Sequence, residues 1–235
     1  AIRGVGGGLM HFVDSKTELA RVWETEFTSV DSTAPQMGIT HVDHIGQTMN
    51  YEELLTWLLF YTTLFETRKT PMLDVVDPAG LVQSQAIENA QGTIRITLNG
   101  ADRRATLAGH FISESFGSSV QHVAFASSDI FGTAQALQTT GFRPLVISPN
   151  YFADIQARFG LEDAFVDQLK ANNILYDRDE AGGEYFQLYS TLYGDGFFFE
   201  IVERRNGYNG YGAPNAQFRI AAQKRTLRHA GVLRG

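Results

Sequence analysis

One order of predicted elements, a strand, a helix and then further strands, occurs twice in this chain of 235 residues. The first occurrence covers about residues 39–100 and the second about residues 119–204. The two stretches share a pattern rather than a sequence period, so the repeat is one of fold. Two such βαβββ units can pair into an open, curved sheet around a cup. We therefore expect an α+β protein in which two modules form a half-barrel.

The first unit is recognised by a change in hydrophobic periodicity. Residues 39–49 are apolar and β-branched, which is typical of a strand, and Asn50 is placed to cap a helix. The apolar face of that helix is predicted to carry Leu54, Trp57, Leu58 and Tyr61. Two strands are expected next, at 81–88 and 93–99, and in the second of them apolar and polar residues alternate strictly.

The second unit has the same order with helical material inserted. A strand is predicted at 119–127, followed by a helix that Asp129 caps and that runs through Leu137. Residues 149–173 are predicted to be helical. Three strands are then expected in ILYDRD, EYFQLYS and GFFFEIVERR, and a final lid helix at about 215–229.

Composition excludes several classes of protein. With 19 basic and 26 acidic side chains the net charge is −7, which argues against a nucleic-acid partner. The longest apolar stretch, Leu54 to Phe65, is too short to cross a bilayer. The chain has no cysteine, so any metal must be bound by histidine, aspartate or glutamate. We expect a cytoplasmic protein that forms a homo-oligomer.

Three residues form a candidate metal site. His44 and His122 occupy matching positions on the first strand of each unit, and Glu200 interrupts the apolar strand GFFFEIVERR. A buried carboxylate is strongly disfavoured unless a cation or hydrogen bonds compensate its charge. Two neutral imidazoles and one carboxylate form a facial triad, which suits Fe(II) and leaves positions open for a bidentate substrate and O₂.

Less specific explanations remain for the same residues. A histidine in a core strand is more often structural than ligating, and Glu200 could instead pair with Arg95, Arg204 or Arg205. The remaining histidines lack a comparable context, and His41 should face away from His44 because three residues separate them on one strand. We interpret these four as surface or structural residues: His11, His41, His110 and His229.

Six segments, in order and with their spacing, resemble 4-hydroxyphenylpyruvate dioxygenases of the vicinal oxygen chelate superfamily. They are THVDHIG, GTIRITLNG, SVQHVAFAS, YFQLYS, GFFFEIVERR and GYGAPN. The resemblance covers roughly residues 1–220. The segments KTPMLDVVDPAGLVQSQAIE and EIVERRNGYNGYGAPNA are most similar to a dioxygenase-like region that some bacteria carry behind a 3-dehydroshikimate dehydratase barrel.

The resemblance implies a ligand set and a reaction class. The iron ligands of the family fall on His44, His122 and Glu200, and Mg, Mn, Co or Zn could take the place of Fe(II). The polar residues on the substrate side fall on Ser84, Asn99 and Gln187. The implied partners are an aromatic 2-oxo acid, or a related anion, and O₂.

Two departures from the family pattern affect the implied substrate. Where the family has a glutamine before the helix that leads to the second histidine, this chain has the apolar Leu107 and Ala108. Where the family closes the pocket with a phenylalanine, this chain has Ala216. We therefore expect a wider, less aromatic pocket, and metal binding is better supported than turnover of 4-hydroxyphenylpyruvate.

The resemblance also implies a domain arrangement. Residues 1–36 correspond to the end of a preceding N-terminal half, and residues 37–235 to the metal-binding dioxygenase-like domain, so we expect fusion to further N-terminal domains. An alternative is a structural or regulatory domain of a two-domain 3-dehydroshikimate dehydratase. Another vicinal oxygen chelate enzyme, such as an extradiol dioxygenase or a glyoxalase, is a third possibility, although no fourth ligand for a glyoxalase is evident.

Overall fold

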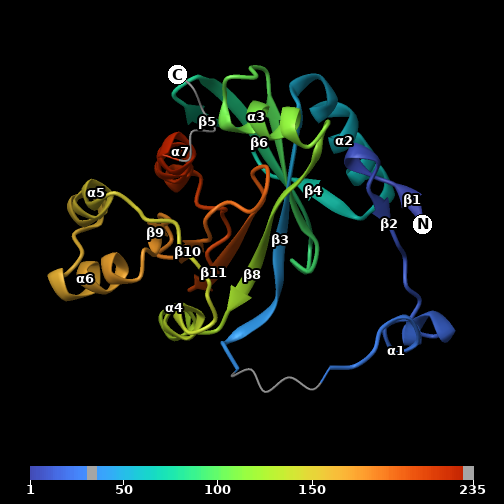
Figure 1. The fold of residues 1–235 in the computed structure, drawn as a ribbon, viewed down its shortest axis with the longest axis horizontal. Helices are drawn as coiled ribbons and strands as arrows, with labels where there is room; N and C mark the ends of the chain where they lie inside the picture. The colour runs from blue at the N-terminus through green and yellow to red at the C-terminus, as the bar shows by residue number, and fades with distance from the viewer. Residues whose placement is uncertain (31–35, 230–235) are drawn as a thin grey trace.

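A computed structural model describes residues 1–30 and 36–229, with side chains up to residue 227 at the C-terminal end. The first 30 residues form short elements outside the main sheet, and Figure 1 shows the last of them, α1, standing away from it. These elements are β1 (Ile2–Arg3), β2 (Leu9–Met10) and α1 (Val22–Glu26), with 3₁₀ turns at Val5–Gly7 and Glu18–Arg21.

The first module starts with a long strand and a helix and ends with four strands. Its elements are β3 (Ile39–Asn50), α2 (Tyr51–Leu64), β4 (Thr67–Lys69), β5 (Leu73–Asp77), β6 (Gly80–Asn89) and β7 (Arg95–Ala101). The helix α3 (Leu107–Glu114) connects it to the second module.

The second module repeats the order with two inserted helices. Its elements are β8 (Ser119–Ser127), α4 (Ile130–Gln138), α5 (Pro149–Phe159), α6 (Asp163–Ala171), β9 (Leu175–Arg178), β10 (Glu184–Tyr189) and β11 (Phe198–Arg205). The helix α7 (Ala213–His229) follows it.

All strands from β3 onward form one nine-stranded sheet with a symmetric order. The order is β4-β6-β7-β3-β8-β11-β10-β9, and β5 pairs with β6. In each module the first strand is parallel to the last, β3 to β7 and β8 to β11. The antiparallel pair β3–β8 joins the two modules at the centre of the sheet (Figure 1). The predicted half-barrel of two modules with a C-terminal helix is thus confirmed.

Each module packs its helix on its own half of the sheet and has its own core. On the first half, Leu54, Leu58 and Tyr61 of α2 pack on Met49, Ile87 and Leu98. A larger cluster on the second half joins α4, α5 and α6 to β9, β10 and β11. Each half of the sheet is therefore stabilised by an apolar core of its own.

Within the described residues, no helix combines the length and the apolar character that crossing a bilayer would require.

The structure corrects three details of the sequence prediction. Asn50 is the N-cap residue of α2, but its side chain donates to Glu53 Oε1 at 2.8 Å rather than capping the backbone. Trp57 is only half-buried, whereas the other three residues of the predicted apolar face are buried. The short edge strands β4 and β5 were not expected, because prolines and charged residues interrupt their segments.

A single hydroxyl group connects α5, β9 and α7. The Tyr151 side chain is 1% exposed, and its oxygen accepts from the Tyr176 backbone N–H at 2.7 Å and lies 2.9 Å from Asn215 Oδ1. The inserted helices are thus hydrogen-bonded to both the sheet edge and the C-terminal helix.

We expect Tyr151→Phe to lower the free energy of unfolding by about 1–3 kcal/mol, because it leaves the buried Tyr176 N–H and Asn215 Oδ1 without this partner. The measurement is urea denaturation followed by circular dichroism. Tyr51→Phe, on an exposed ring of α2, is the matched control and should change little. Equal denaturation midpoints for the two variants would contradict this role.

Candidate metal centre

Three neighbouring strands at the centre of the sheet bring the predicted metal ligands together. His44 lies on β3, His122 on β8 and Glu200 on β11. His44 and Glu200 are both in register with Ala124 of β8, one on each side of it. His122 lies two residues earlier on β8, so the three side chains form a triangle on one face of the sheet.

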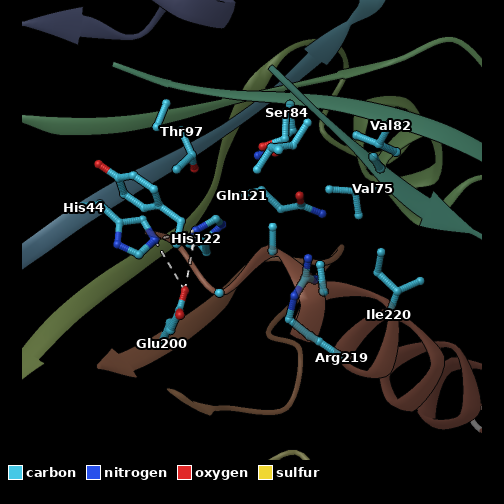
Figure 2. A pocket seen from close by; sticks show the side chains of 18 of the residues that line it. His44, Val75, Val82, Ser84, Thr97, Gln121, His122, Glu200, Arg219 and Ile220 are labelled. Carbon is cyan, nitrogen blue, oxygen red and sulfur yellow. Dashed lines mark hydrogen bonds and ion pairs between the residues drawn. The ribbon is translucent and has the colours of Figure 1, made fainter. Parts of the chain in front are cut away.

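The ligand atoms of the three residues converge. His44 Nε2 lies 3.3 Å from His122 Nε2 and 3.5 Å from Glu200 Oε2, and His122 Nε2 lies 3.7 Å from the same carboxylate oxygen. One ligand atom from each residue falls within 4.8 Å of the others. All three residues are buried, and Figure 2 shows their side chains pointing toward one another. The protein would therefore surround a metal on the side of these three ligands.

Two small residues make room for this arrangement. Ala124, between His44 and Glu200, is 0% exposed. Gly46 faces His122, and a Cβ added at Gly46 would lie 1.8 Å from Cε1 of that imidazole. A side chain of any size at position 46 would therefore displace the His122 ring.

A buried carboxylate orients the first imidazole. Asp43 Oδ1 lies 2.8 Å from His44 Nδ1, which places the N–H on Nδ1 and leaves Nε2 facing the other ligands. Arg204 donates to both oxygens of Asp43 at 2.9 Å, and Arg95 adds a contact of 3.5 Å. Hydrogen bonds with His44 and Arg204 hold the pKa of Asp43 well below its usual range despite burial.

The charges of the three ligands suit a divalent cation. Burial and the neighbouring His44 lower the pKa of His122 to about 3, so this imidazole is neutral at neutral pH. Burial alone would raise the pKa of Glu200, but hydrogen bonding to His44 outweighs it and keeps the carboxylate ionised. Hydrogen bonds to Asp43 and Glu200 outweigh burial at His44 and raise its pKa, so a metal would displace a proton there.

Glu200 is supported by a line of amides. Gln187 Nε2 donates to Glu200 Oε1 at 2.9 Å, and Asn215 Nδ2 donates to Gln187 Oε1 at 2.8 Å. Asn215 in turn contacts Tyr151, as described above. The carboxylate oxygen that faces away from the histidines is therefore fixed by α7 and by the inserted helices.

Arginine does not neutralise Glu200, in contrast to the alternative that the sequence left open. Arg95 and Arg204 pair with Asp43, and Arg205 pairs with Glu203 at 2.6 Å. Successive residues of a strand point to opposite faces, so Arg205, five residues after Glu200 on β11, also lies on the other face of the sheet.

The other histidines lie elsewhere. His11 and His41 are exposed, and His110 is half-buried with Nδ1 at 3.9 Å from Glu114. The side chain of His229 lies outside the described residues.

The ligands lie at one end of a cavity between the sheet and α7. Of the substrate-side residues implied by the resemblance, Ser84 and Asn99 line this cavity and face each other across β6 and β7. Gln187 is 1% exposed and contacts Glu200 instead. Leu107, Ala108 and Ala216 also line the cavity, so the two departures from the family pattern both fall on its wall.

The sequence prediction missed Gln121, which lines the same cavity beside His122. Simple alternation would send Gln121 to the opposite face of β8. However, Val120 is in register with Gln47 and His122 with Gly46, so Gln121 is an extra residue in a bulge. Its side chain accepts from Thr48 Oγ1 at 2.6 Å. A polar residue next to a candidate ligand was the available signal.

We expect Asp43→Asn to weaken metal binding by about 10–100-fold, because His44 loses the carboxylate that orients it. Equilibrium dialysis with Zn²⁺ and elemental analysis would measure this. Asp74→Asn is the control, since Asp74 is exposed on the edge strand β5. Unchanged affinity in Asp43→Asn, with a native circular dichroism spectrum, would show that Asp43 does not position the ligand.

No family model matches the sequence. A Pseudomonas aeruginosa protein named 3-dehydroshikimate dehydratase is 37% identical over 228 residues, which are 97% of this chain and 36% of that protein. A protein from Pseudomonas sp. named 4-hydroxyphenylpyruvate dioxygenase is 27% identical over 241 residues, covering 99% of this chain and 67% of that protein.

A solved structure agrees with both relatives. It is a xylose isomerase-like TIM barrel/4-hydroxyphenylpyruvate dioxygenase fusion protein, with a TM-score of 0.78 and 38% identity over 95% of this chain and 35% of that one. The chain thus spans about a third of the length of the dehydratase relative and of the fusion protein. It is a 4-hydroxyphenylpyruvate dioxygenase-like region, similar in sequence and fold to part of longer proteins that include a 3-dehydroshikimate dehydratase.

Proposed function

We propose that this chain holds one divalent metal ion, Fe(II) by its resemblance, through His44, His122 and Glu200, and acts as a dioxygenase-like domain on a 2-oxo acid or related anion. The observation that carries the proposal is the convergence of the three ligand atoms within 4.8 Å at the end of a cavity. A redox-active metal on such a triad would supply the chemistry with O₂.

The protein's own part is to fix the ligands and receive the substrate. One carboxylate offsets only one of the two charges of a divalent metal, so the site would still attract an anion. Ser84 and Asn99 would hydrogen-bond the substrate from the sheet side of the cavity. Gln187 would act through Glu200, whose outer oxygen it already binds.

The cavity wall favours a substrate other than 4-hydroxyphenylpyruvate. Leu107 and Ala108 offer no hydrogen bond where the family has an amide, and Ala216 offers no ring to cover an aromatic substrate. We therefore propose that the chain binds a metal and shares the reaction class of the family, with a substrate that differs from 4-hydroxyphenylpyruvate in its ring.

A second candidate is a structural or regulatory domain of a longer 3-dehydroshikimate dehydratase. The relative of that name supports it, as do large apolar side chains left exposed in the first 30 residues, which another domain would cover. These side chains are Leu9, Phe12, Trp23, Phe27 and Val30.

We expect His122→Ala to lower the bound metal sharply, because two ligands bind a divalent ion far more weakly than three. The measurement is the metal content after loading with Fe(II) under argon, determined by elemental analysis. His41→Ala, an exposed histidine on β3, is the matched control and should retain the metal. Equal metal content in His122→Ala and the parent would reject this site.

Oxygen uptake separates the two candidate functions. The iron-loaded chain is mixed with 4-hydroxyphenylpyruvate, or with phenylpyruvate as a second 2-oxo acid, in an oxygen electrode. Uptake that His122→Ala abolishes would support the dioxygenase-like function. No uptake with either acid by a chain that does hold iron would reject turnover of these aromatic 2-oxo acids and favour the structural role.

A further inference from the structure

The cavity has a cation on the wall formed by α7. Arg219 lines the cavity and is half-buried, and Figure 2 shows its side chain reaching from the helix into the space shared with His122 and Glu200. Its Nη1 donates to Gln223 Oε1 at 2.7 Å. Its guanidinium carbon also lies 5.0 Å from the centre of the Phe198 ring and 5.6 Å from that of Tyr189.

Arg219 differs from the other cations around the site. Arg204, Arg95 and Lys224 each pair with a buried aspartate. Among the described residues, no carboxylate lies within ion-pair distance of Arg219, whose neighbours are an amide and two rings. A guanidinium has five N–H donors in a planar fork that matches a carboxylate, and most of these donors remain available here.

The position of Arg219 relative to the metal ligands proposed above limits the length of a ligand that contacts both. The imidazole of His122 stacks on Phe198 with ring centres 4.9 Å apart, and Arg219 lies 5.0 Å from the same ring. The guanidinium therefore lies no farther from the His122 imidazole than the sum of these two distances. This upper limit favours a compact ligand, with no more than one six-membered ring between the two groups, over an extended chain.

The remaining wall supports a cyclic ligand. Val75, Leu107 and Ile220 are aliphatic and line the cavity, and Ala216 leaves space on the same helix as Arg219. Flat rings bind well between aliphatic side chains with a few convergent polar groups. A purely apolar ligand would leave the Arg219 charge uncompensated in a half-buried wall.

We propose that Arg219 binds the carboxylate of a small cyclic or aromatic carboxylic acid, whose opposite edge carries two neighbouring oxygens directed toward His44, His122 and Glu200. The placement of the two neighbouring oxygens rests on the metal site proposed above, whereas the placement of the carboxylate rests on Arg219 alone. Arg219 is thus the residue that selects an anion at the end of the ligand away from the metal.

The test compares 3,4-dihydroxybenzoate with catechol, which lacks only the carboxylate. Binding to the Zn²⁺-loaded chain is measured by isothermal titration calorimetry, with Zn²⁺ used because it does not oxidise a catechol. The parent should bind the benzoate about tenfold or more tighter, since a charge-assisted pair contributes roughly that factor. Arg219→Leu should remove this preference and leave the catechol affinity unchanged, and Arg219→Lys should retain part of it.

The matched control is Arg225→Leu, which removes an exposed arginine of the same helix and should keep the preference. Circular dichroism checks that each variant is folded. Equal affinity of the parent for the two ligands, equal weakening of both by Arg219→Leu, or no binding by the parent would overturn the proposal.

A second arm separates this proposal from the metal site. 4-Hydroxybenzoate and phenol, which do not chelate, are titrated into the metal-free chain. A preference for the benzoate that Arg219→Leu abolishes would support the role of Arg219 even if the chain holds no metal. Absence of that preference, in a chain that binds Zn²⁺, would overturn the role of Arg219 and leave the metal site standing.

Discussion

The negative charge of Glu200, in the middle of an apolar strand, is the constraint on which the rest of the site depends. Burying an ionised carboxylate costs several kcal/mol unless charges and hydrogen bonds compensate it. Here two imidazoles approach one oxygen and Gln187 binds the other. The arginines that could have neutralised it are engaged elsewhere, two of them with Asp43. Glu200 is thus kept ionised beside two imidazole nitrogens, and an ionised carboxylate is the form that binds a metal.

The antiparallel pair β3–β8 brings the two imidazoles together. Asp43 is an extra residue in β3, because Val42 is in register with Phe125 and His44 with Ala124. Gln121 is an extra residue in β8 in the same way. Each bulge places a polar side chain next to a histidine, one to orient the imidazole and one to line the cavity. The bulge at Asp43 also breaks the alternation that was expected to separate His41 from His44.

The helix α7 decides what the cavity can accept. It contributes Ala216, Ile220 and Arg219 to the wall, and Lys224 fixes it to the sheet by pairing with Asp77. The aromatic cover that the family resemblance implies is replaced by a small side chain, and a cation stands one turn farther along. The chain thus brings together the three candidate ligands expected of a dioxygenase-like domain, and its cavity wall is less aromatic and carries a cation.

The sequence by itself determined the two modules, most of the long elements, and the three residues that meet at the centre. It could do so because hydrophobic periodicity is local and because a glutamate among phenylalanines is conspicuous without coordinates. The edge strands, the pairing of Arg95 and Arg204 with Asp43, and the cavity positions of Gln121 and Arg219 were decided only by the tertiary structure. Each of these depends on register, bulges or contacts between residues far apart in the chain, which periodicity does not encode.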